Sequence, residues 1–186
     1  IVSIANNYMR KPVRIEIARA GTHADGITQE TFIVPQDDKN EVLAKLLYEY
    51  TGTVLVFART RSRARRVARV VKNLGHAAAE IHSDRTLAQR RAALDGFKAG
   101  TYRVLVATDI AARGIDVNGI ELVLNYDLPD CAEDYVHRIG RTGRAGKTGH
   151  AISLAAPDQV ADMREIEKLM RTEIAISKHS RHEFER

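Results

Sequence analysis

The sequence predicts an α/β fold, in which a mainly parallel sheet is flanked by helices on both faces. Short apolar runs such as residues 53–58 and 104–107 are typical of strands that are buried on both faces. Between them lie segments with apolar residues at helical spacing, for example Val67, Val70, Val71 and Leu74. Apolar strands that alternate with amphipathic helices favour parallel strands in one three-layer domain.

Each predicted element has a local pattern that supports it. The strands are apolar runs bounded by polar residues, glycine or proline, at residues 27–34, 53–58, 77–81, 104–107, 120–125 and 151–154. The helices carry apolar residues three and four positions apart: one after Asp37 or Asp38 through 47, then 59–72, 87–97, a short turn up to 113, 134–139 and 160–170. Gly100 is expected just past the end of its helix, where a left-handed residue is common.

These elements divide the chain into a lead-in segment (residues 1–26), a folded domain (27–172) and a polar tail (173–186). His179 and His182 lie in that tail without a further candidate ligand in the sequence, so we expect no metal site. No apolar run approaches the roughly 20 residues that span a bilayer, so no membrane association is expected. Cys131 is the only cysteine, which favours an intracellular, cytoplasmic protein. The formal net charge of +5 permits a nucleic-acid partner without requiring one.

A stretch at residues 135–149 interleaves cations with glycines. The cations are Arg138, Arg141, Arg144 and Lys147, and the glycines are Gly140, Gly143, Gly146 and Gly149. Glycine at this density opposes a helix, and it lets backbone approach a ligand closely. Arginine forks suit phosphate oxygens. The pattern indicates a polyanion site, and the alternative is a solvated basic loop.

The end of this stretch superficially resembles a phosphate-binding P-loop. That motif requires glycine five residues before Gly146, where this chain has Arg141, and it requires a helix afterwards. Residues 150–154 read as a strand instead, so we reject a P-loop here.

Polar side chains follow four of the predicted strands, and ligands in parallel α/β folds lie beyond these carboxyl ends. They are Arg59-Thr60, His82-Ser83-Asp84, Thr108-Asp109 and Tyr126-Asp127. Hydroxyls and cations at such turns suit a phosphate backbone that is bound without base readout. Ordinary turn and capping chemistry is the alternative. Residues 59–72 also carry seven cations and no acid, a basic face that can be merely solvated.

The sequence resembles the second RecA-like lobe of a DEAD-box ATP-dependent RNA helicase, from about Tyr8 to Met170. The motifs that carry the resemblance are VLVFART at residues 54–60, ATDIAARGID at 107–116, NYDLP at 125–129 and HRIGRTGR at 137–144. His137 resembles the DEAD-box branch, since related helicases carry glutamine there.

The resemblance implies a role for each matching residue. Arg141 and Arg144 would be the arginine fingers that reach the γ-phosphate of ATP, and His137 and Arg138 would tie the loop to a first lobe. Gly114 and Asp116 would contact the ribose. The RNA backbone would be held by Arg59, Thr60, Asp84, Arg90 and Thr108. Ser83 and Leu87 depart from the family pattern, where glycine and glutamine are usual, which weakens the expected RNA contacts of the 87–97 helix.

No P-loop and no Asp-Glu-Ala-Asp motif occur in these residues. By the resemblance, ATP and Mg²⁺ would be bound mainly by an N-terminal RecA-like lobe of the same protein, and this chain would be half of an enzyme that binds RNA. Two other hypotheses stay open, a non-catalytic nucleic-acid-binding module and a DNA translocase lobe of the same fold.

Overall fold

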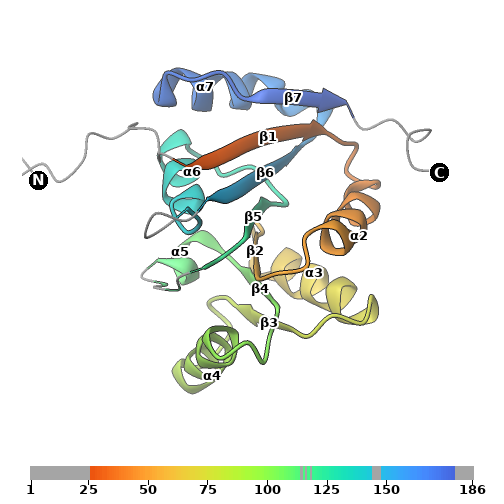
Figure 1. Cartoon of the computed structure of the whole chain (residues 1–186), viewed down its shortest axis with the longest axis vertical. Coiled ribbons are helices and arrows are strands. Elements are labelled where there is room, and N and C mark those ends of the chain that lie inside the picture. Colours follow the sequence, from red (N-terminus) through yellow and green to blue (C-terminus); the bar gives the residue numbers. More distant parts are fainter. Residues whose placement is uncertain (1–25, 114, 116, 118, 144–147, 179–186) are drawn as a thin grey trace, which may run out of the picture.

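The computed structural model describes residues 26–113, 115, 117, 119–143 and 148–178. Its centre is a parallel sheet in the order β3-β4-β2-β5-β6-β1-β7 (Figure 1). The strands are β1 (Ile27–Ile33), β2 (Val54–Phe57), β3 (Ala78–Ile81), β4 (Val104–Ala107), β5 (Leu122–Asn125), β6 (Gly149–Ala155) and β7 (Ala175–Lys178). The helices are α2 (Lys39–Glu49), α3 (Arg61–Asn73), α4 (Leu87–Lys98), α5 (Asp109–Ala112), α6 (Ala132–Ile139) and α7 (Val160–Met170), with a 3-10 turn, η1, at Pro157–Gln159.

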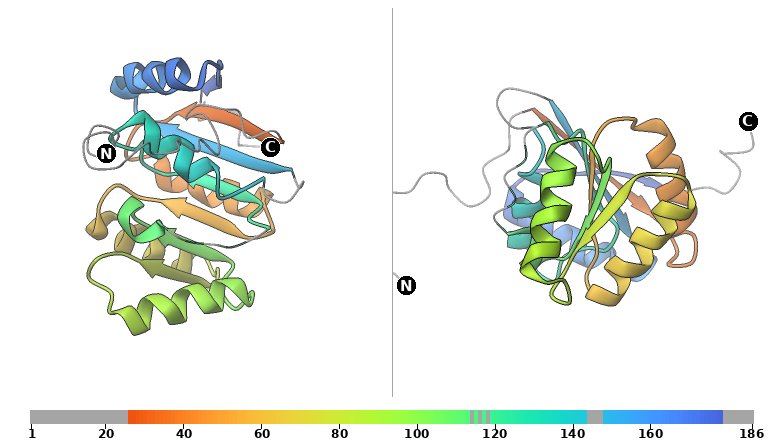
Figure 2. Two further views of the ribbon diagram at one scale, coloured as in Figure 1. Left: turned by 90° about the vertical axis from the view of Figure 1, so that its left-hand side faces the viewer. Right: turned by 90° about the horizontal axis from the view of Figure 1, so that it is seen from below.

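The alternation of side chains along the central strands separates the two faces of the sheet. Val54 and Val56 of β2 pack with Val67 and Val71 of α3, in a core that also includes α2. The intervening residues Leu55 and Phe57 face the other way and pack with Ala93 and Phe97 of α4, in a core that α5 joins. The three-layer arrangement that the sequence predicted is therefore confirmed, with α3 and α4 on opposite sides of the sheet (Figure 2).

A third cluster lies over β1 and β6, where α6 and α7 pack side by side. Tyr135 and Ile139 of α6 meet Met163 and Ile166 of α7 above Ala151 of β6. Burial raises the pKa of Tyr135 to about 12, and its hydroxyl lies 3.2 Å from the Gln29 side-chain oxygen. The cluster holds α6 and the loop that follows it on the α4 face of the sheet.

Threonine caps fix the starts of two helices. Thr60 accepts a hydrogen bond from the Arg63 backbone N–H at the start of α3. Thr86 and Gln89 form a reciprocal capping box at the start of α4. Asp38 takes the N-cap position of α2, as the sequence suggested, but makes no capping hydrogen bond through its side chain. Gly100 has φ +78° just after α4, as expected.

One boundary differs from the expectation. The segment from residue 173 was expected to be a polar tail, but β7 joins the edge of the sheet in parallel register with β1, from Glu30↔Ala175 onward. Ile174 is 4% exposed, and its backbone N–H donates to the Glu167 carboxylate at 2.8 Å. A strand of four residues is too short to show a clear alternation of apolar and polar residues, so the sequence pattern did not predict β7.

None of the helices in the described ranges is long and apolar enough to cross a membrane. Across the same ranges, no three or more His, Cys, Asp or Glu side chains are grouped as metal ligands.

Candidate functional site

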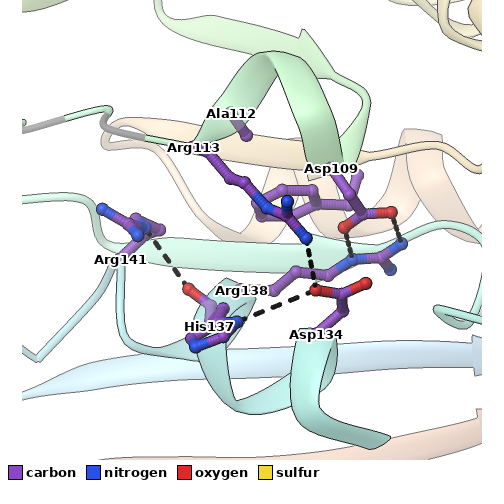
Figure 3. Close-up of a pocket in the computed structure, with 8 residues that line it drawn as sticks. Asp109, Ala112, Arg113, Asp134, His137, Arg138 and Arg141 are labelled. Carbon is purple, nitrogen blue, oxygen red and sulfur yellow. Dashed lines mark hydrogen bonds and ion pairs between the residues drawn. The ribbon is translucent and has the colours of Figure 1, made fainter. Parts of the chain in front are cut away.

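The centre of the site is the buried guanidinium of Arg138, which lies on α6 and is 1% exposed. It forms a bidentate pair with Asp109 of α5, at 2.5 Å (Nε–Oδ1) and 2.7 Å (Nη2–Oδ2) (Figure 3). Its Nη1 donates to Asn125 Oδ1 at 3.1 Å and to the Asp127 carbonyl at 2.7 Å. The guanidinium carbon lies 4.9 Å from the centre of the Phe57 ring. All three nitrogens are therefore used inside this chain.

The expected tie from Arg138 to a first lobe stays a prediction, but most of its guanidinium is occupied inside this chain. Four of its five N–H donors are bound within this chain, one on Nε, two on Nη1 and one on Nη2. Its role here is to join α6, α5 and the ends of β2 and β5. A buried pair of this kind is tolerated only when the remaining donors and acceptors are satisfied, as most of them are at Arg138.

A shallow pocket with about 240 Å³ of empty space opens beside this pair, between α5 and α6. On its rim Asp134 lies 3.4 Å from Arg113 Nη2 and 3.7 Å from His137 Nδ1 (Figure 3). Partial burial opposes ionisation of Asp134, but hydrogen bonds from Cys131, Arg113 and His137 outweigh it and hold its pKa below the usual range. The His137 side chain is 69% exposed, so it is accessible for the interlobe contact that remains a prediction.

Arg141 follows α6 and reaches back across the pocket. Its Nη1 donates to the Ile115 carbonyl at 2.7 Å, and its Nε donates to the His137 carbonyl at 3.3 Å. Ile115 lies between Gly114 and Asp116, the two residues expected at the ribose. Gly114 and Asp116 lie outside the described residues, as does Arg144. Arg141 is thus fixed beside the segment that carries the two expected ribose contacts.

The glycines of this loop have a packing role as well. A Cβ on Gly149 would lie 2.1 Å from Thr142 Oγ1 and 2.5 Å from the Gly143 backbone nitrogen. Gly143 has φ +65°, and a Cβ there would lie 2.5 Å from Ile27. Thr142 and Gly143 therefore lie tightly against the starts of β1 and β6, and Thr142 forms an isolated β-bridge with Ile120. These two residues therefore lie at the amino ends of the strands. The rule that ligands of parallel sheets lie beyond the carboxyl ends does not point to this edge.

The opposite edge gathers the residues expected to hold RNA. Phe57 of β2 pairs with Ala107 of β4, which pairs with Ile81 of β3. The loops that follow these strands, with Arg59-Thr60, His82-Ser83-Asp84 and Thr108, are therefore neighbours. Thr60 is used as a helix cap, whereas Thr108 occupies the N-cap of α5 without a capping hydrogen bond from its hydroxyl. That hydroxyl is the better placed of the two to meet a ligand.

Asp84 has both carboxylate oxygens engaged by α3. Arg61 Nη1 donates to Oδ1 at 2.8 Å and Arg65 Nη2 donates to Oδ2 at 3.0 Å. The Asp84 backbone N–H donates to Nδ1 of the fully buried His82 at 3.2 Å. The expected RNA contact of Asp84 would have to compete with two arginines. Sequence reasoning did not single out Arg61 and Arg65, and the run of cations was the signal for them.

The other two expected RNA contacts are partly engaged. Arg59 donates to the Leu128 carbonyl at 3.2 Å and lies 3.2 Å from Asp130, so its side chain leans towards the end of β5. Arg90 makes a long contact of 3.4 Å to the Ala111 carbonyl. Exposed apolar side chains lie near it in sequence and structure, Leu87 at 62% and Ile110 at 80% exposed. This edge is therefore more apolar than a phosphate site requires.

Lys39 was missed by the sequence analysis. It is 1% exposed, donates to the Tyr126 carbonyl at 2.8 Å and lies 3.8 Å from Asp127 Oδ1. Burial lowers the pKa of Lys39 to about 8, although Asp127 offsets part of the shift. Asp127 also pairs with Arg63 at 3.2 Å. A buried lysine at the start of a helix leaves no pattern in the sequence, because lysine is ordinarily a surface residue.

The parallel sheet, Arg141 bound to the Ile115 carbonyl and the polar carboxyl edge together define a RecA-like lobe of a nucleic-acid helicase. The chain belongs to the family of the helicase conserved C-terminal domain, whose model matches residues 38–146. Its relatives are DEAD-box RNA helicases, as the motifs indicated.

Two curated relatives and one solved structure illustrate the similarity. The ATP-dependent rRNA helicase RRP3 of Scheffersomyces stipitis is 39% identical over 91% of this chain, and the DEAD-box ATP-dependent RNA helicase CshA of Bacillus subtilis is 41% identical over 90%. The chain spans 34% of the length of each. S. cerevisiae Dbp5 bound to RNA and ADP BeF3 superposes with a TM-score of 0.85 at 29% identity, covering 95% of this chain and 48% of that one.

Proposed function

We propose that this chain is the C-terminal lobe of an ATP-dependent RNA helicase that unwinds short RNA duplexes. In this proposal the lobe supplies arginine fingers and half of an RNA-backbone site to a two-lobed, RNA-stimulated ATPase, and it is inactive alone. The observation that supports the proposal is the bond from Arg141 to the carbonyl of Ile115, the described residue between the two expected ribose contacts.

The chemistry of the pocket suits the phosphate end of ATP. Arg141 is oriented by hydrogen bonds to two carbonyl oxygens, those of His137 and Ile115. The nearby carboxylates are engaged, Asp109 by Arg138 and Asp134 by Arg113 and His137. The described residues that line this pocket therefore offer cations to a phosphate, and both of their carboxylates are already engaged. We propose that Mg²⁺ and most of the nucleotide are held by the N-terminal lobe.

Phosphoryl transfer requires little covalent help and much positioning of charge. Arg141 and Arg144 would stabilise negative charge that develops on the transferred phosphoryl group. Because these arginines lie on one lobe and the proposed nucleotide anchor on the other, hydrolysis would require closure of the two lobes. RNA bound across both carboxyl edges would favour the closed state and so couple hydrolysis to strand separation.

Substitution of the fingers in the two-lobed protein tests this assignment. An arginine finger contributes roughly 10³–10⁵ in rate in other phosphoryl-transfer enzymes, and lysine keeps the charge but loses the planar fork. Arg141→Lys and Arg144→Lys should each lower kcat at saturating RNA by about 10³ or more and leave nucleotide-free RNA affinity nearly unchanged. Arg164→Lys, on the distant helix α7, is the matched control.

The alternative is that these arginines form one electrostatic patch for RNA. In that case each substitution would weaken RNA binding, and turnover would recover once RNA is saturating, which would refute the finger assignment. A DNA translocase of the same fold would show ATPase stimulated by DNA, whereas we expect stimulation by RNA only.

The boundaries and location of the lobe are part of the proposal. We place the folded lobe at residues 27–178, because β7 pairs with β1, and treat the segment before it as the interlobe linker. The single cysteine, Cys131, is exposed and unpaired, which suits the reducing cytoplasm that we propose for the protein.

A further inference from the structure

We propose that the outer face of α3 is a second phosphate-binding track, which leads RNA away from the carboxyl edge and along the side of the lobe. This inference rests on the proposed function, since it extends the RNA site of the same lobe. It concerns Arg66, Arg69 and Lys72, to which neither the sequence motifs nor the site described above assigns a role.

The charge on α3 is one-sided. The helix carries five arginines and one lysine over 13 residues, with no acid among them. Its buried side is apolar and consists of Ala64, Val67, Ala68 and Val71. All the cations except the half-buried Arg63 are exposed to solvent. The whole solvent-facing arc of the helix is therefore positive or neutral.

The cations divide into two groups along the helix. At its start Arg61 and Arg65 are bound to Asp84, and Arg63 is bound to Asp127. Further along, the side chains of Arg66, Arg69 and Lys72 make no ion pair or hydrogen bond with any residue that the structure describes. Like charges three residues apart on one helix repel each other. Three unpaired cations in succession cost stability unless an anion is bound there.

The position of α3 connects this group to the RNA edge. The helix α3 follows β2, so its first turn lies at the carboxyl edge of the sheet, beside Asp84. From there it runs back towards the amino ends of the strands, on the face of the sheet opposite to α4 (Figure 2). Thirteen residues at about 1.5 Å each span about 20 Å. A single-stranded RNA that leaves the carboxyl edge of the sheet can therefore lie along α3 over a length of several successive phosphates.

The chemistry favours nucleic acid over an acidic protein as the partner. Arginine predominates, and its planar fork matches phosphate oxygens in two-point contacts. Protein interfaces need an apolar centre, and α3 offers none along its exposed arc. Leu74, 43% exposed, lies just past the end of the helix. An extended cationic face without an apolar centre is typical of sequence-independent backbone binding.

The test compares a track variant with a control of equal charge in the full chain. The track variant is Arg66→Gln/Arg69→Gln/Lys72→Gln, and the control is Arg164→Gln/Lys168→Gln/Arg171→Asn on α7. Arg171 has a left-handed backbone, φ 54°, which asparagine tolerates. Fluorescence anisotropy is measured with single-stranded RNAs of about 6 and about 20 nucleotides, within and beyond usual single-strand site sizes. Urea unfolding confirms that both variants are folded.

We expect the track variant to bind the long RNA at least tenfold more weakly at low salt, with the short RNA changed less than twofold. The slope of log K against log salt should become shallower by about 0.7 for each lost phosphate contact. The α7 control should match the unsubstituted chain. Equal long-RNA affinity in both variants would overturn the track, and so would equal weakening of the short and long RNAs, which would make α3 part of the core site.

Two further arms separate the alternatives. If the track variant keeps its RNA affinity but loses binding to polyglutamate, the partner is an acidic protein and the nucleic-acid track is wrong. A core variant, Arg90→Gln/Thr108→Val, should weaken both RNAs. If it weakens neither, the proposed carboxyl-edge site fails, and a loss of long-RNA binding in the track variant alone would still support the track.

Discussion

Arg138 of α6 and Asp109 of α5 are joined by two hydrogen bonds, from Nε at 2.5 Å and from Nη2 at 2.7 Å. The same guanidinium binds Asn125 and the Asp127 carbonyl, at the end of β5. One side chain thus sets the spacing of the two helices that frame the pocket beside Arg141. The first arginine of the glycine-arginine pattern therefore holds its neighbours in place.

Replacement of Arg138 should therefore destabilise the fold. Arg138→Met leaves Asp109 and Asn125 with unmet hydrogen bonds in a nearly buried site, and breaking a buried pair in this way costs about 3–5 kcal/mol. The free energy of unfolding of the chain in urea measures the loss. Arg113→Met removes an exposed arginine that lies 3.4 Å from the partly buried Asp134, and it should cost less than about 1 kcal/mol. Similar losses for the two variants would contradict the structural role of Arg138.

A second prediction concerns the glycine at the start of β6. A Cβ on Gly149 would overlap Thr142 and the Gly143 backbone, so Gly149→Ala must displace the loop that carries Arg141. In the two-lobed protein we expect ATPase turnover to fall by at least tenfold while the protein stays folded. Overpacking costs about 1–3 kcal/mol, which a domain of this size can absorb.

The matched control is Gly100→Ala. Gly100 has a positive φ, 78°, and a Cβ there would meet nothing within 4 Å. Its substitution should cost about 1–2 kcal/mol of stability and leave turnover unchanged. Loss of turnover in both variants would show that the effect comes from reduced stability, and normal turnover in Gly149→Ala would show that the loop position does not matter.

The sequence predicted most of the sheet because its central strands are unbroken apolar runs, and burial on both faces requires such runs. Val54–Phe57 and Val104–Ala107 are fully or nearly fully buried, as this pattern implies. It did not predict β7, whose four residues are held by pairing with β1 and by the neighbouring Ile174 rather than by their own pattern.

The site was predictable in outline and less so in detail. The pattern indicated that the chain leaves the helix, because glycine at such density opposes a helix, and α6 does end at Ile139. Which of the arginines is buried depends on how α6 is oriented against the sheet and on the position of Asp109. Both are set by tertiary packing, which the sequence pattern does not show. Asp84 was grouped with RNA contacts by its position after β3, and only the structure shows Arg61 and Arg65 on its two oxygens.

A third prediction follows from the buried amine of Lys39. Burial lowers its pKa from 10.5 to about 8 in the folded chain. Below about pH 8 the amine is charged in both states, so the cost of burying the charge is fully present. Between about pH 8 and 10.5 the unfolded chain binds a proton that the folded chain does not, so stability rises with pH, by about 3 kcal/mol in all.

Urea unfolding of the unsubstituted chain and of Lys39→Met between pH 7 and 10 measures this effect. The unsubstituted chain should gain stability relative to Lys39→Met as the pH rises, because methionine cannot titrate. Lys45→Met removes a lysine that pairs with Glu41 at the surface of α2, and its difference from the unsubstituted chain should stay flat. A constant difference for Lys39→Met would mean that Lys39 keeps an ordinary pKa.

The last prediction decides the role of Asp84. If its carboxylate accepts a hydrogen bond from RNA, the partner is a ribose 2′-hydroxyl, since phosphate oxygens would be repelled. In that case Asp84→Asn would weaken RNA binding and leave DNA binding unchanged, because the 2′-hydroxyl distinguishes the two.

The contacts of Asp84 favour the opposite result. Both oxygens bind arginines, Arg61 at 2.8 Å and Arg65 at 3.0 Å, so the carboxylate neutralises part of the positive edge. Asp84→Asn releases up to one net positive charge there, and one more phosphate contact on a single strand raises affinity by about fivefold near 0.1 M salt. We expect RNA and DNA of the same length and sequence to bind more tightly by the same factor, with a steeper salt dependence for both.

Arg61→Gln should weaken the binding of both RNA and DNA, because it removes the cation and leaves Asp84 in place. Anisotropy titrations of the full chain at three salt concentrations measure these changes. A selective loss of RNA affinity in Asp84→Asn would restore Asp84 as a direct contact and make the two arginines its supports.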